Sequence, residues 1–197
     1  MRYLIASAVL LLSVGAARAV PITYTDTSAV VRVTIAGGAP QLGSLTLSET
    51  ANTSTIVTIS PGNFANPGTV TFTFTPQLGG TPTTGTFTDS MQVGVNQGIP
   101  AAGFVDTTLS FNVLATDGNA ALASYALTTS LPATSGSALD SLGTAFPTSV
   151  GTLVLDSIPQ DIPTTTFSAT TTSEPGSLSI LALGLVGVGA MRRPRRG

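Results

Sequence analysis

The chain has 197 residues and a formal net charge of −2, but it contains no His, Lys, Cys or Trp. These absences exclude a Ser-His-Asp triad, a Cys nucleophile, a Ser-Lys dyad, disulfides and metal sites built from His or Cys. Between residues 20 and 173, Arg32 stands alone against eight carboxylates, a formal charge of −7, which excludes nucleic acid as a partner.

The first 19 residues have the pattern of a secretory signal peptide. Arg2 supplies the positive end, residues 3–14 are apolar, and Ala17-Arg18-Ala19 fits the small-x-small rule for cleavage. We predict that signal peptidase cleaves after Ala19 and that the chain is exported across the inner membrane. An uncleaved N-terminal anchor is the alternative.

Residues 20–169 are predicted to form one all-β domain. The chain has 33 Thr residues, and Gly and Pro separate short runs in which apolar and polar residues alternate. We predict strands at 31–35, 44–48, 56–59, 69–75, 84–95, 105–113, 123–131, 153–155 and 165–167. The turn signal Asp117-Gly118-Asn119 predicts a hairpin between 105–113 and 123–131. Residues 132–150 are predicted to be irregular, with one helical turn.

The pattern of elements favours one architecture. About nine short strands without a helical period indicate a single antiparallel β-sandwich, jelly-roll-like in topology. A β-solenoid is the alternative, but the sequence has no fixed repeat period.

Few groups are left that could carry catalysis. A pair of carboxylates, as in glycoside hydrolysis, is the arrangement that the composition still allows. Clefts that cleave sugars usually contain aromatic platforms, whereas this chain lacks Trp and has three Tyr. We therefore expect a protein that is not an enzyme and that needs no cofactor.

Calcium could still be bound, because it needs only oxygen ligands. Asp106, Asp117 and Asn119 lie near the ends of the predicted hairpin and are the candidate ligands. Turns favour Asp and Asn for backbone reasons, and the spacing matches no calcium-binding loop. We therefore expect turn residues here and no metal site.

Thr69, Thr71, Thr73 and Thr75 would share one face of a predicted strand. A flat array of Thr can order surface water or ice. The simpler interpretation is the solvent-facing side of a Thr-rich strand, because one strand is a small platform.

The last 24 residues combine a turn, an apolar run and a basic end. Glu174-Pro175-Gly176-Ser177 precedes the apolar run 178–191, and Arg192, Arg193, Arg195 and Arg196 follow it. As a helix the run would reach about 21 Å, less than the roughly 30 Å of a hydrocarbon core. It is therefore a marginal permanent anchor. Residues 170–173 are the predicted linker to it.

This tail resembles the PEP-CTERM sorting domain of Gram-negative bacteria, a module also described as an ice-binding protein C-terminal domain. The resemblance implies recognition by an exosortase at Glu174, Pro175 and Gly176, a transmembrane helix over 178–191 and a cytoplasmic stop at the four arginines. Family motifs usually read Pro-Glu-Pro, whereas Ser173 precedes Glu174 here.

The resemblance further implies delivery to the cell surface or to its exopolysaccharide matrix. Two functions remain open for the body domain. It is a non-catalytic protein of the surface or extracellular matrix, as in a biofilm, or a carbohydrate-binding module, with or without calcium, that is retained in exopolysaccharide.

Overall fold

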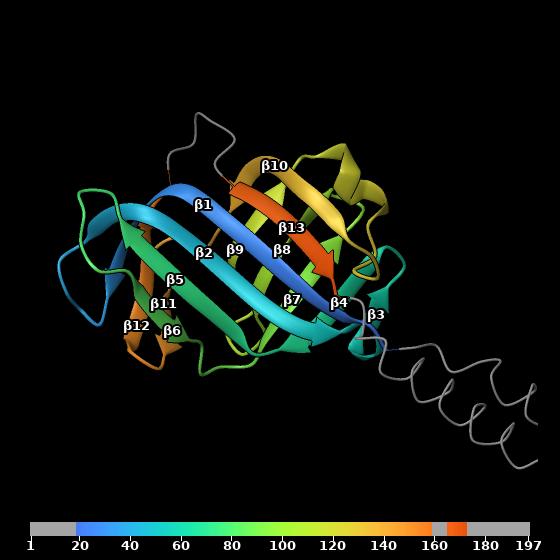
Figure 1. Cartoon of the computed structure of the whole chain (residues 1–197), viewed down its shortest axis with the longest axis horizontal. Helices are drawn as coiled ribbons and strands as arrows, with labels where there is room; N and C mark the ends of the chain where they lie inside the picture. Colours follow the sequence, from blue (N-terminus) through green and yellow to red (C-terminus); the bar gives the residue numbers. More distant parts are fainter. Residues whose placement is uncertain (1–18, 159–164, 173–197) are drawn as a thin grey trace, which may run out of the picture.

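A computed structural model describes residues 19–158 and 165–172 of the chain. Within these residues, 13 strands form one continuous antiparallel sheet, accompanied by two short 3-10 helices (Figure 1). The all-β prediction is confirmed. No helix in the described part is long and apolar enough to cross a membrane. Residues 1–18 of the predicted signal peptide and the sorting tail from Glu174 lie outside the described residues.

The elements follow one another in chain order. They are β1 (Pro21–Ile35), β2 (Gln41–Asn52), η1 (Thr53–Thr55), β3 (Val57–Ser60), β4 (Asn63–Gly68), β5 (Val70–Pro76), β6 (Thr83–Thr86), β7 (Met91–Asn96), β8 (Ala101–Asp106), β9 (Phe111–Asp117), η2 (Ala120–Ser124), β10 (Leu131–Leu139), β11 (Ala145–Thr148), β12 (Gly151–Ser157) and β13 (Thr165–Thr171). The last strand thus ends inside the segment 170–173 that was predicted as a linker.

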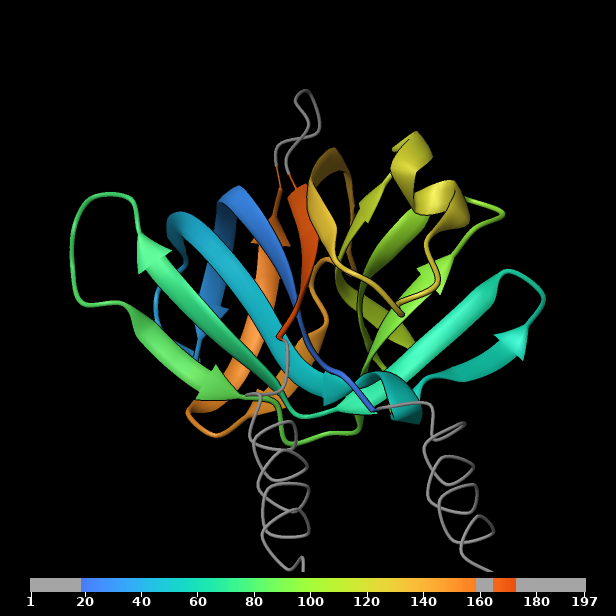
Figure 2. The ribbon, with the colours of Figure 1, turned by 45° about the vertical axis from the view of Figure 1, so that its right-hand side comes forward.

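The long strand β1 connects the two halves of the sheet. The strand order is β3-β4-β7-β8-β9-β10-β13-β1-β2-β5-β6. On one side β1 pairs with β2; on the other its first half pairs with β13 and its second half with β12. β12 carries β11, and an isolated bridge from Phe87 to Thr148 brings β11 to the chain that follows β6 (Figure 2).

The sheet folds back so that its inward side chains form one core. Strands β13, β1, β2 and β5 cross in front of β7, β8 and β9 in Figure 1, and β1 and β13 contact β9. Phe87 packs edge-on against Phe72 and Phe146, with ring centroids 5.8 and 6.4 Å apart. Phe167 packs in the same way against Tyr125, at 6.1 Å. Aromatic pairs of this geometry add to the stabilisation from burial.

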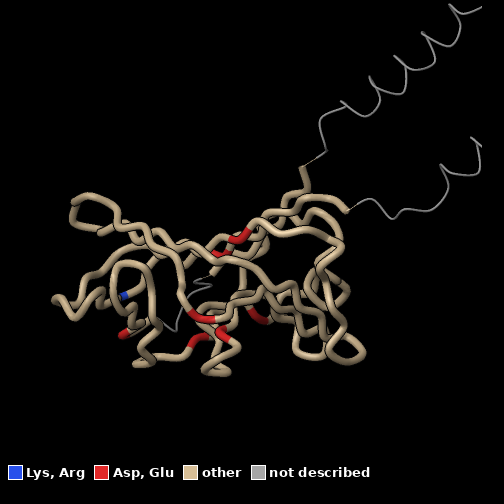
Figure 3. The backbone as a smooth tube through the Cα atoms, turned by 90° about the horizontal axis from the view of Figure 1, so that it is seen from below, with Lys and Arg blue, Asp and Glu red and all other residues tan. Residues whose placement is uncertain are grey.

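Charged residues are sparse in the described chain (Figure 3). Asp26 and Glu49 lie on the inward side of β1 and β2 and are buried. Arg32 is exposed, in the part of β1 that pairs with β12.

Two of the predicted strands have the wrong bounds. Run 84–95 is two strands, and run 105–113 is interrupted after Asp106. The Oδ1 atom of Asp106 accepts hydrogen bonds from the backbone N–H groups of Thr108 (2.8 Å) and Leu109 (2.9 Å), and these bonds close a turn between β8 and β9. The hairpin therefore joins β8 to β9 through a turn at residues 107–110, whereas the sequence predicted a turn at Asp117-Gly118-Asn119.

The segment after this hairpin also differs from the prediction. The predicted strand 123–131 does not form: residues 120–124 form η2, and 125–130 belong to no strand. Asn119 caps η2, because its Oδ1 accepts from the N–H of Ala121 at 3.0 Å. Residues 132–150, predicted as irregular, contain β11 and most of β10. β10 is rich in Ser and Ala, and its one buried residue is Thr134, so its sequence lacks the apolar alternation of a strand.

Candidate functional site

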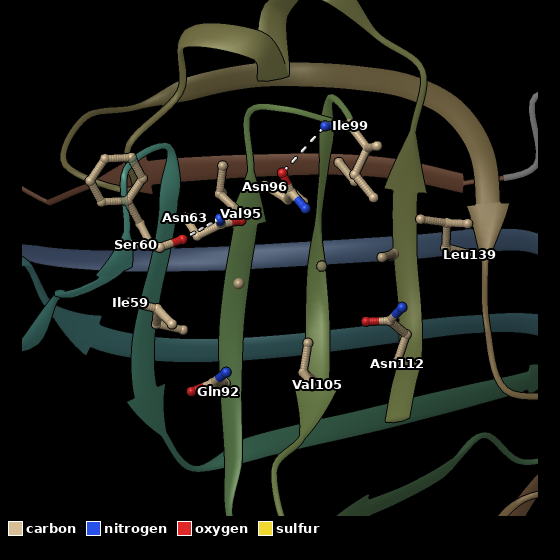
Figure 4. Close-up of a pocket in the computed structure, with 16 residues that line it drawn as sticks. Ile59, Ser60, Asn63, Gln92, Val95, Asn96, Ile99, Val105, Asn112 and Leu139 are labelled. Carbon is tan, nitrogen blue, oxygen red and sulfur yellow. Dashed lines mark hydrogen bonds between the residues drawn. The ribbon is translucent and has the colours of Figure 1, made fainter. Parts of the chain in front are cut away.

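A trough crosses the outer face of β7, β8 and β9 (Figure 4). Its floor is a row of small residues, because Gly94 pairs with Gly103 and Gly103 with Ala115. Residues with little or no side chain leave this row lower than its neighbours. The trough encloses about 290 Å³.

Longer side chains form the two lips of the trough. Gln92, Val105 and Asn112 are paired across β7, β8 and β9 and form one lip. Asn96 and Ile99 lie along the other lip. The trough therefore runs across the strands.

Apolar side chains close the two ends. Ile59 of β3 lies at one end and Leu139 of β10 at the other. Phe64 of β4, which pairs with Val95 of β7, also lines the trough beside β3. Ile59 and Ile99 are 64% and 55% exposed, so apolar surface faces solvent here.

Hydrogen bonds hold part of the wall in place. Asn96 Oδ1 accepts from the backbone N–H groups of Gly98 (2.9 Å) and Ile99 (3.3 Å), which fixes the loop that carries Ile99. Asn63 Nδ2 donates to Ser60 Oγ at 2.6 Å. The Gln92 and Asn112 side chains are half-buried and make no hydrogen bond to another described residue. Among the described residues, none competes with a ligand for these two amide groups.

The trough is uncharged. None of the described residues that line it carries a charge, although the body of the chain is strongly acidic. Amides donate and accept hydrogen bonds, and the apolar ends can contact C–H groups. The arrangement suits an uncharged ligand that is rich in hydroxyl groups.

Two carboxyl groups with raised pKa values, those of Asp26 and Glu49, lie elsewhere, in the core. Asp26 Oδ1 accepts from Thr116 Oγ1 at 3.1 Å, and burial raises the pKa of Asp26 from 3.8 to about 7. Burial also raises the pKa of Glu49 from 4.5 to about 8. Oδ2 of Asp26 and both oxygens of Glu49 lack a hydrogen-bond partner among the described residues. These groups are out of reach of a ligand in the trough.

A buried tyrosine joins the two halves of the fold. Tyr24 donates its O–H to the carbonyl of Leu127 at 2.8 Å and accepts from Asn66 Nδ2 at 3.1 Å. Burial raises the pKa of Tyr24 to about 12, so the hydroxyl stays protonated.

The three candidate calcium ligands are not brought together. Asp106 pairs with Phe111 at the start of β9, whereas Asp117 ends that strand, six residues or about 20 Å away. Asn119 caps η2, and its Nδ2 donates to the carbonyl of Ser135. No group of three or more acidic residues that could hold a metal occurs in the described ranges. The structure thus separates Asp106 from Asp117 along β9, and calcium binding stays a prediction.

The trough itself was missed by the sequence analysis. On β7 the alternation does place Gln92, Gly94 and Asn96 outward, but the row that forms the floor depends on the pairing of three strands. The predicted functional residues Ala17, Glu174, Pro175, Gly176 and the terminal arginines lie outside the described residues, and Ala19 is the first residue that the structure describes. Comparisons with protein-family models, with curated proteins and with solved structures found no match.

Proposed function

We propose that the protein is an exported, non-catalytic component of the cell surface or extracellular matrix, and that its trough binds an uncharged polysaccharide. The uncharged trough with its free amide groups is the observation that supports this proposal. Gln92 and Asn112 would bond to sugar hydroxyls, while Val105 and the apolar ends would contact C–H faces. Because the floor of the trough has no aromatic platform, a single trough would bind the polysaccharide weakly. Retention in a matrix would therefore rely on many copies of the protein that bind at once.

The chemistry of the described residues supports a binding role over a catalytic one. A hydrolase needs two carboxyl groups at the bond it cleaves. No carboxyl group is among the described residues of the trough, and Asp26 and Glu49 are buried on the other side of the sheet. We describe the body domain as sandwich-like, with β13, β1, β2 and β5 packed over β7, β8 and β9; a jelly-roll topology remains the proposal.

The two ends of the chain support export and sorting. Cleavage after Ala19 would release the body, and the tail from Glu174 to the arginines would present the protein to an exosortase. Before processing, run 178–191 would hold the chain in the inner membrane. Sorting to the surface would bring the trough to exopolysaccharide.

Filling the trough tests the binding proposal. An added Cβ on Gly94 would lie 3.6 Å from Val105 Cγ2, an ordinary contact, so Gly94→Val can be accommodated while its methyl groups occupy the trough. The full chain should bind neutral oligosaccharides on a printed array that also carries uronic-acid glycans. We expect Gly94→Val to lose this binding.

The matched control is Thr152→Val on β12, an exposed position outside the trough. It should bind as the wild type does, and both variants should unfold at the same temperature as the wild type. Binding that Gly94→Val leaves unchanged, or a folded wild type that binds no neutral glycan, would contradict the proposal.

A further inference from the structure

A second surface consists of hydroxyl side chains. Along the outer face of six neighbouring strands, one complete row reads Ser135, Thr166, Thr27, Thr46, Thr73 and Thr84 from β10 to β6. The next row is also continuous in Ser and Thr, from Ser168 of β13 to Thr86 of β6. We call these two rows, with Thr23, Thr50 and Thr170 beside them, the hydroxyl face. It turns the single Thr ladder of β5 into a two-dimensional array.

The array is regular and fixed. Neighbouring strands lie about 4.8 Å apart, and every second residue of a strand about 6.7 Å apart, so the hydroxyls repeat in both directions. Thr27 and Thr46 share a hydrogen bond at 3.1 Å, and Thr73 and Thr84 share one at 3.2 Å. Each bond sets a side-chain rotamer, already restricted by β-branching, and leaves hydrogen-bonding capacity on both oxygens. Hydroxyl and methyl groups are thus held in place.

The hydroxyl face is also free of charge. On its six strands the charged residues are Asp26 and Glu49, which are buried on the inner side, and Arg32, which lies past the β-bulge of β1. Solvent-facing sides of sheets commonly carry Lys and Glu, but the two rows of the hydroxyl face consist of Ser and Thr. A charged ligand would find no partner here, and a sugar ring would find no aromatic surface.

We propose that the hydroxyl face binds ice. An ice surface is uncharged, periodic and composed of groups that both donate and accept hydrogen bonds, as is this face. Rigid hydroxyls can join such a lattice, and the intervening methyl groups can pack between its water molecules. Because the twist of the sheet limits the area that is flat, the contact lies on the central strands β13, β1, β2 and β5.

This site is separate from the trough. Figure 4 shows β1 and β2 behind the floor of the trough, so the two surfaces face opposite sides of the molecule. The inference uses neither the sorting tail nor binding of a sugar. Each proposal can therefore fail without the other.

The test measures how much of the full chain is taken up by slowly growing ice. Thr46 lies at the centre of the face, and Thr46→Lys places a long charged side chain there. We expect ice to take up the wild type and the control Thr152→Lys, which is exposed on β12. Thr46→Lys should be excluded from ice as a non-binding protein is. Thr25→Lys, in the next row, guards against a folding defect in one variant.

Two results would overturn the proposal. One is a folded wild type that ice excludes as fully as it excludes a non-binding protein. The other is uptake of both Thr46→Lys and Thr25→Lys at the wild-type level. A thermal unfolding curve for each variant shows that it is folded. Gly94→Val should keep its uptake by ice, and Thr46→Lys should keep any glycan binding.

Discussion

Asp26 makes the stability of the fold dependent on pH. Its side chain is 0% exposed, and one carboxyl oxygen has no hydrogen-bond partner in the described structure. The charged form is therefore disfavoured in the folded chain, and burial raises the pKa from 3.8 to about 7. Glu49 is buried as well, and its pKa rises to about 8.

The direction of the effect follows from proton binding. Between about pH 4 and pH 7 the folded chain keeps a proton on Asp26 that the unfolded chain has lost, so the free energy of unfolding falls as the pH rises. The pKa values of Asp26 in the folded and unfolded chains differ by about three pH units, which corresponds to about 4 kcal/mol in the free energy of unfolding. The stabilisation is complete below the unfolded pKa and is lost as the pH passes through the folded pKa. Glu49 adds a further decrease in the free energy of unfolding, which continues up to about pH 8.

Replacing the carboxyl group isolates the contribution of Asp26. Asp26→Asn is nearly isosteric and cannot ionise, so it should be more stable than the wild type at pH 8 by up to about 4 kcal/mol. The difference should shrink toward pH 5. Urea unfolding followed by circular dichroism at several pH values measures both chains. Asp156→Asn on β12 is the control, because it makes the same substitution at an exposed position.

Two outcomes would refute this reasoning. The first is a wild-type stability that stays level or increases from pH 5 to pH 8. The second is an Asp26→Asn variant that loses stability with pH as steeply as the wild type.

Two further predictions concern particular contacts, and a third concerns the processing of the two ends of the chain. Gly103→Ala should cost about 1–3 kcal/mol in urea unfolding, because the new Cβ would lie 2.3 Å from Ala115 Cα; a neutral result would mean that the strands can separate there. Tyr24→Phe should cost about 1–3 kcal/mol by the same assay, since it leaves the buried Leu127 carbonyl unpaired; an unchanged midpoint would show that this bond is dispensable. In the native host, the intact mass should show loss of residues 1–19 and of the tail, with the tail retained in Pro175→Ala; a wild type that keeps its tail would indicate a plain membrane anchor.

Local pattern was enough where apolar alternation was clean. Val70, Phe72 and Phe74 alternate with Thr, and β5 buries all three as predicted. The first half of β1 was missed, because Asp26 and Ser28 stand at inward positions where the pattern would have required apolar residues. A strand with polar residues at its inward positions lacks the alternation from which strands are predicted.

Both candidate surfaces depend on contacts that sequence pattern does not contain. The row of Thr on β5 was visible in the sequence, but Thr46 and Thr27 join it only because β5 pairs with β2 and β2 with β1, both earlier in the chain. In the same way, Gly94 and Gly103 look like two ordinary glycines until the register of β7 and β8 places them side by side. Strand register is set by the whole sheet, so neither surface could be predicted strand by strand.

The most direct test of the proposed function is a map of the residues that a sugar contacts. The full chain would be titrated with the neutral oligosaccharide that it binds best on the array, and backbone amide NMR signals would be recorded. We predict that the signals of Gly94, Gly103 and Asn112 shift with the titration, while those of Thr46 and Thr73 stay in place. Shifts confined to the hydroxyl face, or no shifts at all, would contradict the assignment of the trough as the binding site.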